Sequence, residues 1–369
     1  MIAASRRWAV LVLAPWLGAC VIDASIDGKG CPCADGYICN AADMCVRKTC
    51  DPGVVASSFA PAWATSHSIG WTWKPGGSED LFVRYEVWVA ETKEDLAART
   101  GTARRFGKEE NPELGGYRLR VATDLVSSTI TRGLEGGTTY FAQLIAVDVR
   151  DCEFASERVQ RSTPPEPQSS IDLFKDGLPA GAETGPAPPA YQVADDPAGG
   201  MHLVFDVYAD DECVPDEMDF NDVKATCGQP LRVRGFSADV SHDPSNPAKE
   251  ALEPGTFVDA YLAMEVDIDA VVPSYFSWLW LANGASCLPA ENPDHIFRYD
   301  GAFTIPNGKP TTIELPLSVL ENVEPGSARP FSYDEIDAQG SGSALCSFAL
   351  GGSWHKLGVV HVDDVAIWF

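Results

Sequence analysis

The sequence has few basic residues and few histidines. It carries 27 Lys and Arg against 53 Asp and Glu, with six His, and its formal net charge is -26. This charge disfavours nucleic acid and anionic lipid headgroups as partners. Three catalytic motifs are absent: the Gly-x-Ser-x-Gly elbow, the His-Glu-x-x-His zinc motif and the phosphate-binding loop. Since the histidines are also scattered, we expect a protein that is not an enzyme.

The apolar run near the N-terminus is short. It covers residues 8–17 and cannot span a bilayer as a helix. Arg6 and Arg7 precede it and small residues follow it, which is the layout of a cleaved secretory signal. The segment ends Leu17-Gly18-Ala19-Cys20, which resembles the lipobox of bacterial lipoproteins. The resemblance implies that Cys20 becomes the N-terminus and carries several acyl chains, enough for stable anchoring to a membrane.

The residue after Cys20 is Val21 rather than aspartate, so the inner-membrane retention signal of enteric lipoproteins is missing. We therefore expect a lipid-anchored protein of the bacterial outer membrane or cell surface. The alternative is ordinary secretion with Cys20 unmodified. Cleavage before Cys20 leaves 25 basic and 53 acidic residues, a net charge of -28.

Charge and composition divide the mature chain. Residues 168–369 carry a net charge of -23, whereas residues 51–167 carry -4, which indicates two distinct domains. Apolar residues make up 45% of the sequence, enough for hydrophobic cores. The predicted parts are a signal peptide (1–19), a lipidated tether (20–30), a Cys-rich module (31–50), a first domain (51–163), a proline-rich linker (164–170) and a second domain (171–369).

Eleven cysteines are present, and assigning Cys20 to the lipid leaves ten, an even number in an exported protein. Disulfides are therefore expected. The ten are Cys31, Cys33, Cys39, Cys45, Cys50, Cys152, Cys213, Cys227, Cys287 and Cys346. Five lie in the Cys-rich module and one follows at 152, which suggests a bridge between these regions. A zinc site in the module is the alternative, but no histidine lies among its cysteines.

Short alternating segments fill residues 51–163 and predict strands. Ile69, Trp71 and Trp73 share one face of such a segment. The stretch from Leu134 through Tyr140 to Asp148 resembles the corner and following strand of fibronectin type III domains. The resemblance implies an immunoglobulin-like β-sandwich in which the Tyr140 hydroxyl bonds back to the upstream backbone. It also implies that Cys50 and Cys152 lie at the same end of the sandwich and pair.

Residues 171–369 also read as alternating strands, so the whole chain is predicted to be all-β: a small disulfide-rich module, a β-sandwich and a second β domain. The opening Ile171-Asp-Leu-Phe174 and the closing strand around Asp363 resemble the galactose-binding-like jelly roll of bacterial carbohydrate-binding modules. In that family an acid of the first strand and an aspartate of the last share a structural calcium, which implies Asp172 and Asp363. An acidic run at 206–222 is a second calcium candidate. We favour pairing Cys213 with Cys227 and Cys287 with Cys346.

The jelly-roll resemblance implies that aromatic rings stack on sugars, and Tyr275 and Trp354 are the chosen candidates. The predicted function is non-catalytic binding of polysaccharide or glycoconjugate by an anchored monomer. The first alternative is a structural or adhesion lipoprotein that binds a surface protein and no sugar. The second is a glycan hydrolase, which needs only two carboxylates.

Overall fold

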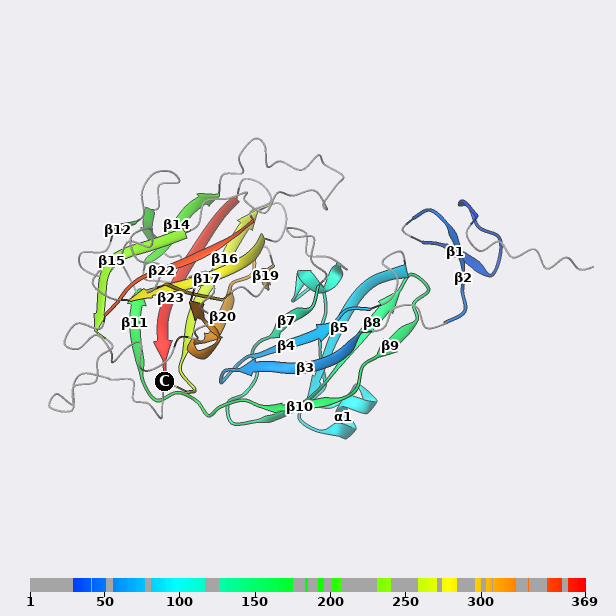
Figure 1. Ribbon diagram of the computed structural model, residues 1–369, viewed down its shortest axis with the longest axis horizontal. Helices are drawn as coiled ribbons and strands as arrows, with labels where there is room; N and C mark the ends of the chain where they lie inside the picture. The colour runs from blue at the N-terminus through cyan, green and yellow to red at the C-terminus, as the bar shows by residue number, and fades with distance from the viewer. Residues whose placement is uncertain are drawn as a thin grey trace, which may run out of the picture. The chain divides into compact units, whose positions relative to one another are not determined.

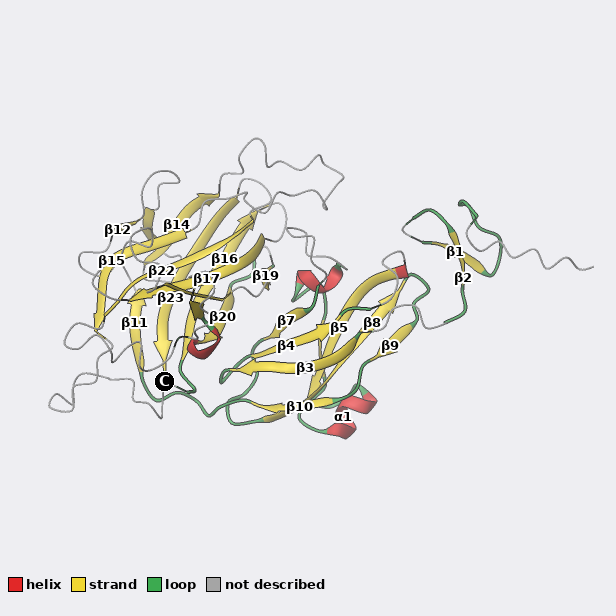
Figure 2. Ribbon diagram, viewed as in Figure 1, coloured by secondary structure: helices red, strands yellow, loops and turns green. Residues whose placement is uncertain are grey.

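The structure is a computed structural model. It describes residues 29–40, 42–50, 56–76, 81–116, 126–174, 183–184, 192–195, 201–207, 231–239, 258–270, 274–283, 296–299, 303–306, 308–322, 331, 344–353 and 358–369. The chain forms two compact units, residues 1–48 and 49–369. Among the described residues the regular elements are mainly strands, and the helices are short (Figure 2). No helix within the described ranges has the length and apolar character needed to cross a membrane. The all-β prediction is confirmed.

The N-terminal unit is a hairpin closed by disulfides. Strands β1 (Tyr37–Cys39) and β2 (Cys45–Arg47) pair antiparallel. Bridges join Cys31 to Cys39 and Cys33 to Cys45. The module thus contains disulfides, as predicted, and these four sulfurs are not free thiolates for zinc.

Residues 57–162 form a two-layered sandwich (Figure 1). One layer is the sheet β3-β4-β7 and the other is β10-β8-β5-β6, with β9 paired to β8. This division of strands is that of immunoglobulin-like folds. The strands are β3 (Ser57–Ala64), β4 (Ile69–Lys74), β5 (Phe82–Ala90), β6 (Arg104–Phe106), β7 (Ser128–Thr131), β8 (Thr139–Asp148), β9 (Glu153–Ala155) and β10 (Val159–Ser162). Helix α1 (Lys93–Ala98) follows β5, and a 3-10 turn (Pro112–Gly115) follows β6.

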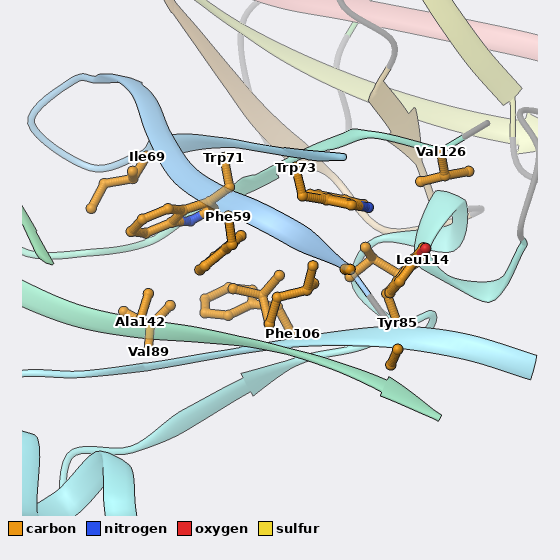
Figure 3. Close-up of a cluster of buried hydrophobic side chains, with 14 of the residues drawn as sticks. Phe59, Ile69, Trp71, Trp73, Tyr85, Val89, Phe106, Leu114, Val126 and Ala142 are labelled. Atoms are coloured by element: carbon orange, nitrogen blue, oxygen red, sulfur yellow. The ribbon is translucent and has the colours of Figure 1, made fainter. Parts of the chain in front are cut away.

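Aromatic side chains fill the space between these two layers (Figure 3). Trp71 is fully buried and stacks on Phe59, with ring centroids 5.2 Å apart. Trp73 meets Tyr85 edge to face at the same distance. The predicted alternation of Ile69, Trp71 and Trp73 toward one face is therefore confirmed.

The two features implied by the fibronectin resemblance are present. The Tyr140 hydroxyl accepts a hydrogen bond from the backbone N–H of Glu135 at 2.8 Å. Cys50 is joined to Cys152, with Cα atoms 5.5 Å apart. The bridge fastens the segment before β3 to the loop between β8 and β9.

Residues 170–368 form a second sandwich of the jelly-roll type. One sheet has the order β13-β14-β23-β16-β20 with β11 paired to β23, and the other has the order β12-β15-β22-β17-β18-β21 with β19 paired to β17. The strands are β11 (Ser170–Phe174), β12 (Glu183–Thr184), β13 (Gln192–Asp195), β14 (Met201–Val207), β15 (Leu231–Asp239), β16 (Tyr261–Ala270), β17 (Ser274–Asn283), β18 (Ile296–Tyr299), β19 (Phe303–Ile305), β20 (Thr311–Pro316), β21 (Glu321–Asn322), β22 (Ala344–Ser353) and β23 (Gly358–Trp368). A 3-10 turn (Leu317–Val319) follows β20.

The opening and closing strands of this domain are neighbours (Figure 1). Strand β16 pairs along one edge of β23, from Trp368 back to Gly358. The other edge pairs with β11 near the C-terminal end of β23 and with β14 near its N-terminal end. The six-stranded sheet therefore presents β11, β23, β16 and β20 side by side.

Candidate functional site

One face of the six-stranded sheet carries small and acidic side chains in register. Asp172 lies opposite Ala366, Ala366 opposite Ala263, and Ala263 opposite Glu314. Residues opposite each other on paired strands point to the same face. The small side chains of Ala366 and Ala263 leave space above the middle of this row, and the carboxylates of Asp172 and Glu314 lie at its two ends. Trp368 lies opposite Tyr261 in a neighbouring row of the same face.

This face forms one wall of a cavity of about 750 Å³. The first sandwich supplies the other wall, from the turn between β3 and β4, from β6 and from the segment after β7. The linker contributes Glu166 and Pro167. The volume lies in the range of ligand-binding clefts, roughly 300–1,000 Å³.

The cavity lining combines hydrogen-bond acceptors, donors and one exposed aromatic ring. Trp368 is 36% exposed, one of the few large apolar side chains this accessible among the described residues. Three cations line the cavity: Arg104, Arg132 and Lys309. The carboxylates that line it are Glu110, Glu166, Asp172, Glu265, Glu314 and Asp364.

A histidine and two carboxylates join the two walls. His67 Nδ1 lies 2.9 Å from Glu314 Oε1, and His67 Nε2 lies 2.9 Å from Glu166 Oε2. Glu314 is buried and also accepts hydrogen bonds from the Thr65 hydroxyl and from the His67 backbone N–H. Buried carboxylates are stable only with such partners. The contacts connect β20 to the β3–β4 turn and to the linker.

Two tyrosines pack at the same junction. Burial raises the pKa of Tyr261 far above its ordinary value of 10, and the negative charge of Glu314 raises this pKa further. Tyr299 meets Trp63 edge to face, with centroids 6.4 Å apart, and burial raises its pKa too. Both phenols therefore stay neutral at physiological pH and act as hydrogen-bonding groups rather than bases.

Arg132 differs from other arginines of the first sandwich. Its Nε and Nη2 atoms are buried and have no hydrogen-bond partner. Arg84, Arg99 and Arg150, in contrast, each pair with a carboxylate at 2.9 Å or less. Burial lowers the pKa of Arg132 from its ordinary value, and the charge of Glu113 opposes this change.

The two predicted ligand-binding aromatics, Tyr275 and Trp354, stay predictions. Tyr275 belongs to β17 in the seven-stranded sheet, whereas the six-stranded sheet lines the cavity. Trp354 lies outside the described residues. Trp368 was not selected from the sequence, although its alternation with Asp364 and Ala366 on the closing strand placed it on one face. Arg132 was not selected either, because no motif marks it.

Asp172 and Asp364 both line the cavity, and Asp363 directly precedes Asp364 in the chain. The backbone N–H of Asp364 donates to Asp363 Oδ1 at 2.8 Å, and Asp364 has a positive φ of 47°. Among the described residues, the single cluster of three or more side chains with metal-ligand atoms in reach is Cys31, Cys33 and Cys45, which are disulfide-bonded. Calcium at Asp172 and Asp363 stays a prediction.

Several predicted positions lie outside what the structure describes. Cys20, Cys213, Cys227 and Cys287 belong to this group, as does the part of the acidic run 206–222 that follows Val207. Cys346 is described only as a backbone position of β22. The lipid anchor and the two C-terminal disulfides are therefore predictions.

No family model matches the sequence, and no curated protein matches it either. Among solved structures, a carbohydrate-binding module of the β-sandwich superfamily is 10% identical and covers 86% of this chain and 98% of its own, with a TM-score of 0.30. The surface glycan-binding protein PbSGBP-B of Prevotella bryantii is 12% identical over 90% of this chain and 81% of its own, with a TM-score of 0.29. The FN5 domain of Drosophila Lar is 20% identical over 31% of this chain and 98% of its own, with a TM-score of 0.22. At these TM-scores the likenesses carry no argument about function.

Proposed function

We propose that the protein binds polysaccharide in the cavity between its two sandwiches, as a lipid-anchored, non-catalytic protein of the bacterial outer membrane. The observation that carries the proposal is the make-up of the cavity. It combines the exposed ring of Trp368 with carboxylate acceptors and guanidinium and ammonium donors. Sugar hydroxyls both donate and accept hydrogen bonds, and the apolar face of a pyranose stacks on an aromatic ring. A cleft of mixed polarity with one accessible indole suits such a ligand.

The lipid anchor is a separate part of the proposal and rests on the Leu17-Gly18-Ala19-Cys20 resemblance. Acylation of Cys20 would hold the binding domains at the membrane surface, where they would contact an extracellular polysaccharide. Mass spectrometry of the N-terminal peptide tests this part: a diacyl- or triacyl-modified Cys20 is expected, and an unmodified Cys20 in the membrane fraction would contradict it.

The binding test uses the full chain with Cys20→Ser, which removes the predicted acylation site, and affinity electrophoresis in gels that contain single polysaccharides. At least one polymer is expected to retard the protein. Trp368→Ala should weaken binding about tenfold or more, because it removes the stacking surface. Trp88→Ala is the matched control, since this partly buried indole lies on β5 away from the cavity.

Two results would contradict the proposal. Retention by no polymer would favour the protein-binding alternative, and equal retention of the Trp368→Ala variant would place the site elsewhere. The same incubations are assayed for reducing ends, because no product release is expected from a non-catalytic protein. Release of oligosaccharides would instead support the hydrolase alternative.

A further inference from the structure

The guanidinium of Arg132 is the least satisfied charged group that lines the cavity. The residue directly follows β7 and precedes Gly133, whose positive φ of 64° turns the chain. Nε and Nη2 are both buried and both lack a hydrogen-bond partner. Guanidinium N–H groups are obligate donors, and leaving them buried without acceptors costs free energy. Folding alone gives no reason to retain such a group.

Among the described residues, no carboxylate accepts a hydrogen bond from Nε or Nη2 of Arg132. Glu113 is near enough to act on it through space, yet this carboxylate is buried and accepts a hydrogen bond from the Thr129 hydroxyl at 2.5 Å. Arg104 binds the backbone carbonyl oxygens of Arg132 and Gly133 and adds a second positive charge to this wall. Nε and Nη2 therefore have no acceptor in the part of the protein that the structure describes, and because Arg132 lines the cavity, a turn of its side chain would bring both donors to a molecule bound there.

We propose that Arg132 is a sugar-binding residue whose Nε and Nη2 donate to oxygen atoms of a neutral polysaccharide. The inference rests on the proposed glycan-binding function and identifies both a binding residue and the class of glycan. Nε and Nη2 of one guanidinium form a parallel pair of donors. Adjacent hydroxyl oxygens of a sugar ring can accept such a pair.

The charges of the lining favour a neutral glycan over an acidic one. Among the described residues that line the cavity, six are carboxylates and three are Arg or Lys. The mature chain carries a net charge of -28. Both would repel a polymer of uronates or sulfate esters. A neutral polymer avoids this repulsion, because its hydroxyls can donate to Asp172 and Asp364 while its oxygens accept from Arg132.

The experiment measures two properties of Arg132→Met in the full chain with Cys20→Ser. Methionine keeps much of the side-chain volume but has no donors, so the melting temperature without ligand should rise. Affinity for neutral polymers should fall about tenfold or more, since hydrogen bonds from a charged donor are lost. The probes are agarose, galactomannan and a β-glucan, with alginate and polygalacturonate as acidic counterparts. Arg161→Met is the matched control, because Arg161 is an exposed residue of β10 outside the cavity.

The outcomes separate this inference from the proposed function. Binding of a neutral polymer that Arg132→Met weakens and Arg161→Met does not would support it. Unchanged binding by Arg132→Met would overturn the role of Arg132 and leave glycan binding intact. Binding to acidic polymers alone would overturn the class of glycan while glycan binding stands. Binding to no polymer would overturn both. If Arg132→Met does not fold, Arg132→Leu, which also has no donors, replaces it, and unchanged affinity in that variant would equally overturn the inference.

Discussion

At the scale of single residues, several buried polar groups of the first sandwich have local hydrogen-bond partners. Trp71 Nε1 donates to the Thr131 hydroxyl at 2.9 Å, and Asn111 Nδ2 donates to the Ile130 carbonyl oxygen at 2.7 Å. Such bonds let polar atoms lie in a core without a desolvation penalty. The buried Nε and Nη2 of Arg132 have no such partner within the described ranges, and neither has the buried Nε1 of Trp73. Arg132 carries a charge and lines the cavity, which is why we assign its nitrogens to a ligand.

The Tyr140 hydroxyl provides a prediction at this scale. Tyr140→Phe keeps the buried ring but leaves the Glu135 N–H without its acceptor. The free energy of unfolding should fall by about 1–2 kcal/mol. Urea unfolding followed by fluorescence measures the change. Tyr140→Leu is the comparison and should cost clearly more, because it also removes ring packing. Equal stability of wild type and Tyr140→Phe would contradict the corner role.

At the scale of secondary-structure elements, cross-links and ion pairs fasten loops to the sheets. Arg99 ends helix α1 in the left-handed conformation, with φ of 52°. Its guanidinium donates to both carboxylate oxygens of Glu153 on β9 and lies 5.0 Å from the centre of the Trp88 ring. The helix is thereby attached to the β10-β8-β5-β6 sheet through one side chain.

The Arg99–Glu153 pair predicts a pH dependence. The hydrogen bonds from Arg99 lower the pKa of Glu153 from its ordinary value of 4.5. Its stabilisation is therefore present above pH 4.5 and is lost as the pH falls through the lowered value. Glu153→Gln should cost about 0.5 kcal/mol at pH 7, a small effect because the pair is half exposed.

Urea unfolding at pH 7 and at about pH 3 tests this prediction, since the difference from wild type should shrink at the lower pH. Glu157→Gln is the control, because Glu157 is exposed on the segment after β9. A difference that stays constant between the two pH values would show that the charge of Glu153 does not act through Arg99.

The Cys50–Cys152 bridge gives the second prediction for elements. Its cysteines are 102 residues apart, so reduction frees a long loop in the unfolded chain. Replacing both cysteines by serine should lower the free energy of unfolding by about 3–5 kcal/mol. Denaturant unfolding of the oxidised wild type and the double variant measures this. If the wild type treated with reductant kept the stability of the oxidised protein, the bridge would have no such role.

At the scale of the whole molecule, more of the fold than of the candidate site could be predicted from the sequence. Alternation of Ile69, Trp71 and Trp73 predicted a buried face, and the spacing of Leu134 and Tyr140 predicted the corner, because both are local patterns. The cavity depends on residues far apart in sequence, such as Glu314 against His67 and Trp368 against Tyr261. Periodicity shows which residues share a strand face, but not which domain packs against it. Tyr275 and Trp354 were therefore chosen without knowledge of register.

The central claim is that a polysaccharide binds between Trp368 and Arg132. A crystal structure of the full chain with Cys20→Ser, in complex with an oligosaccharide from the polymer it retains, tests this most directly. We predict a sugar ring stacked on the Trp368 indole and sugar oxygens within about 3 Å of Arg132 Nε and Nη2. Sugar bound elsewhere, with the cavity holding solvent alone, would contradict the account.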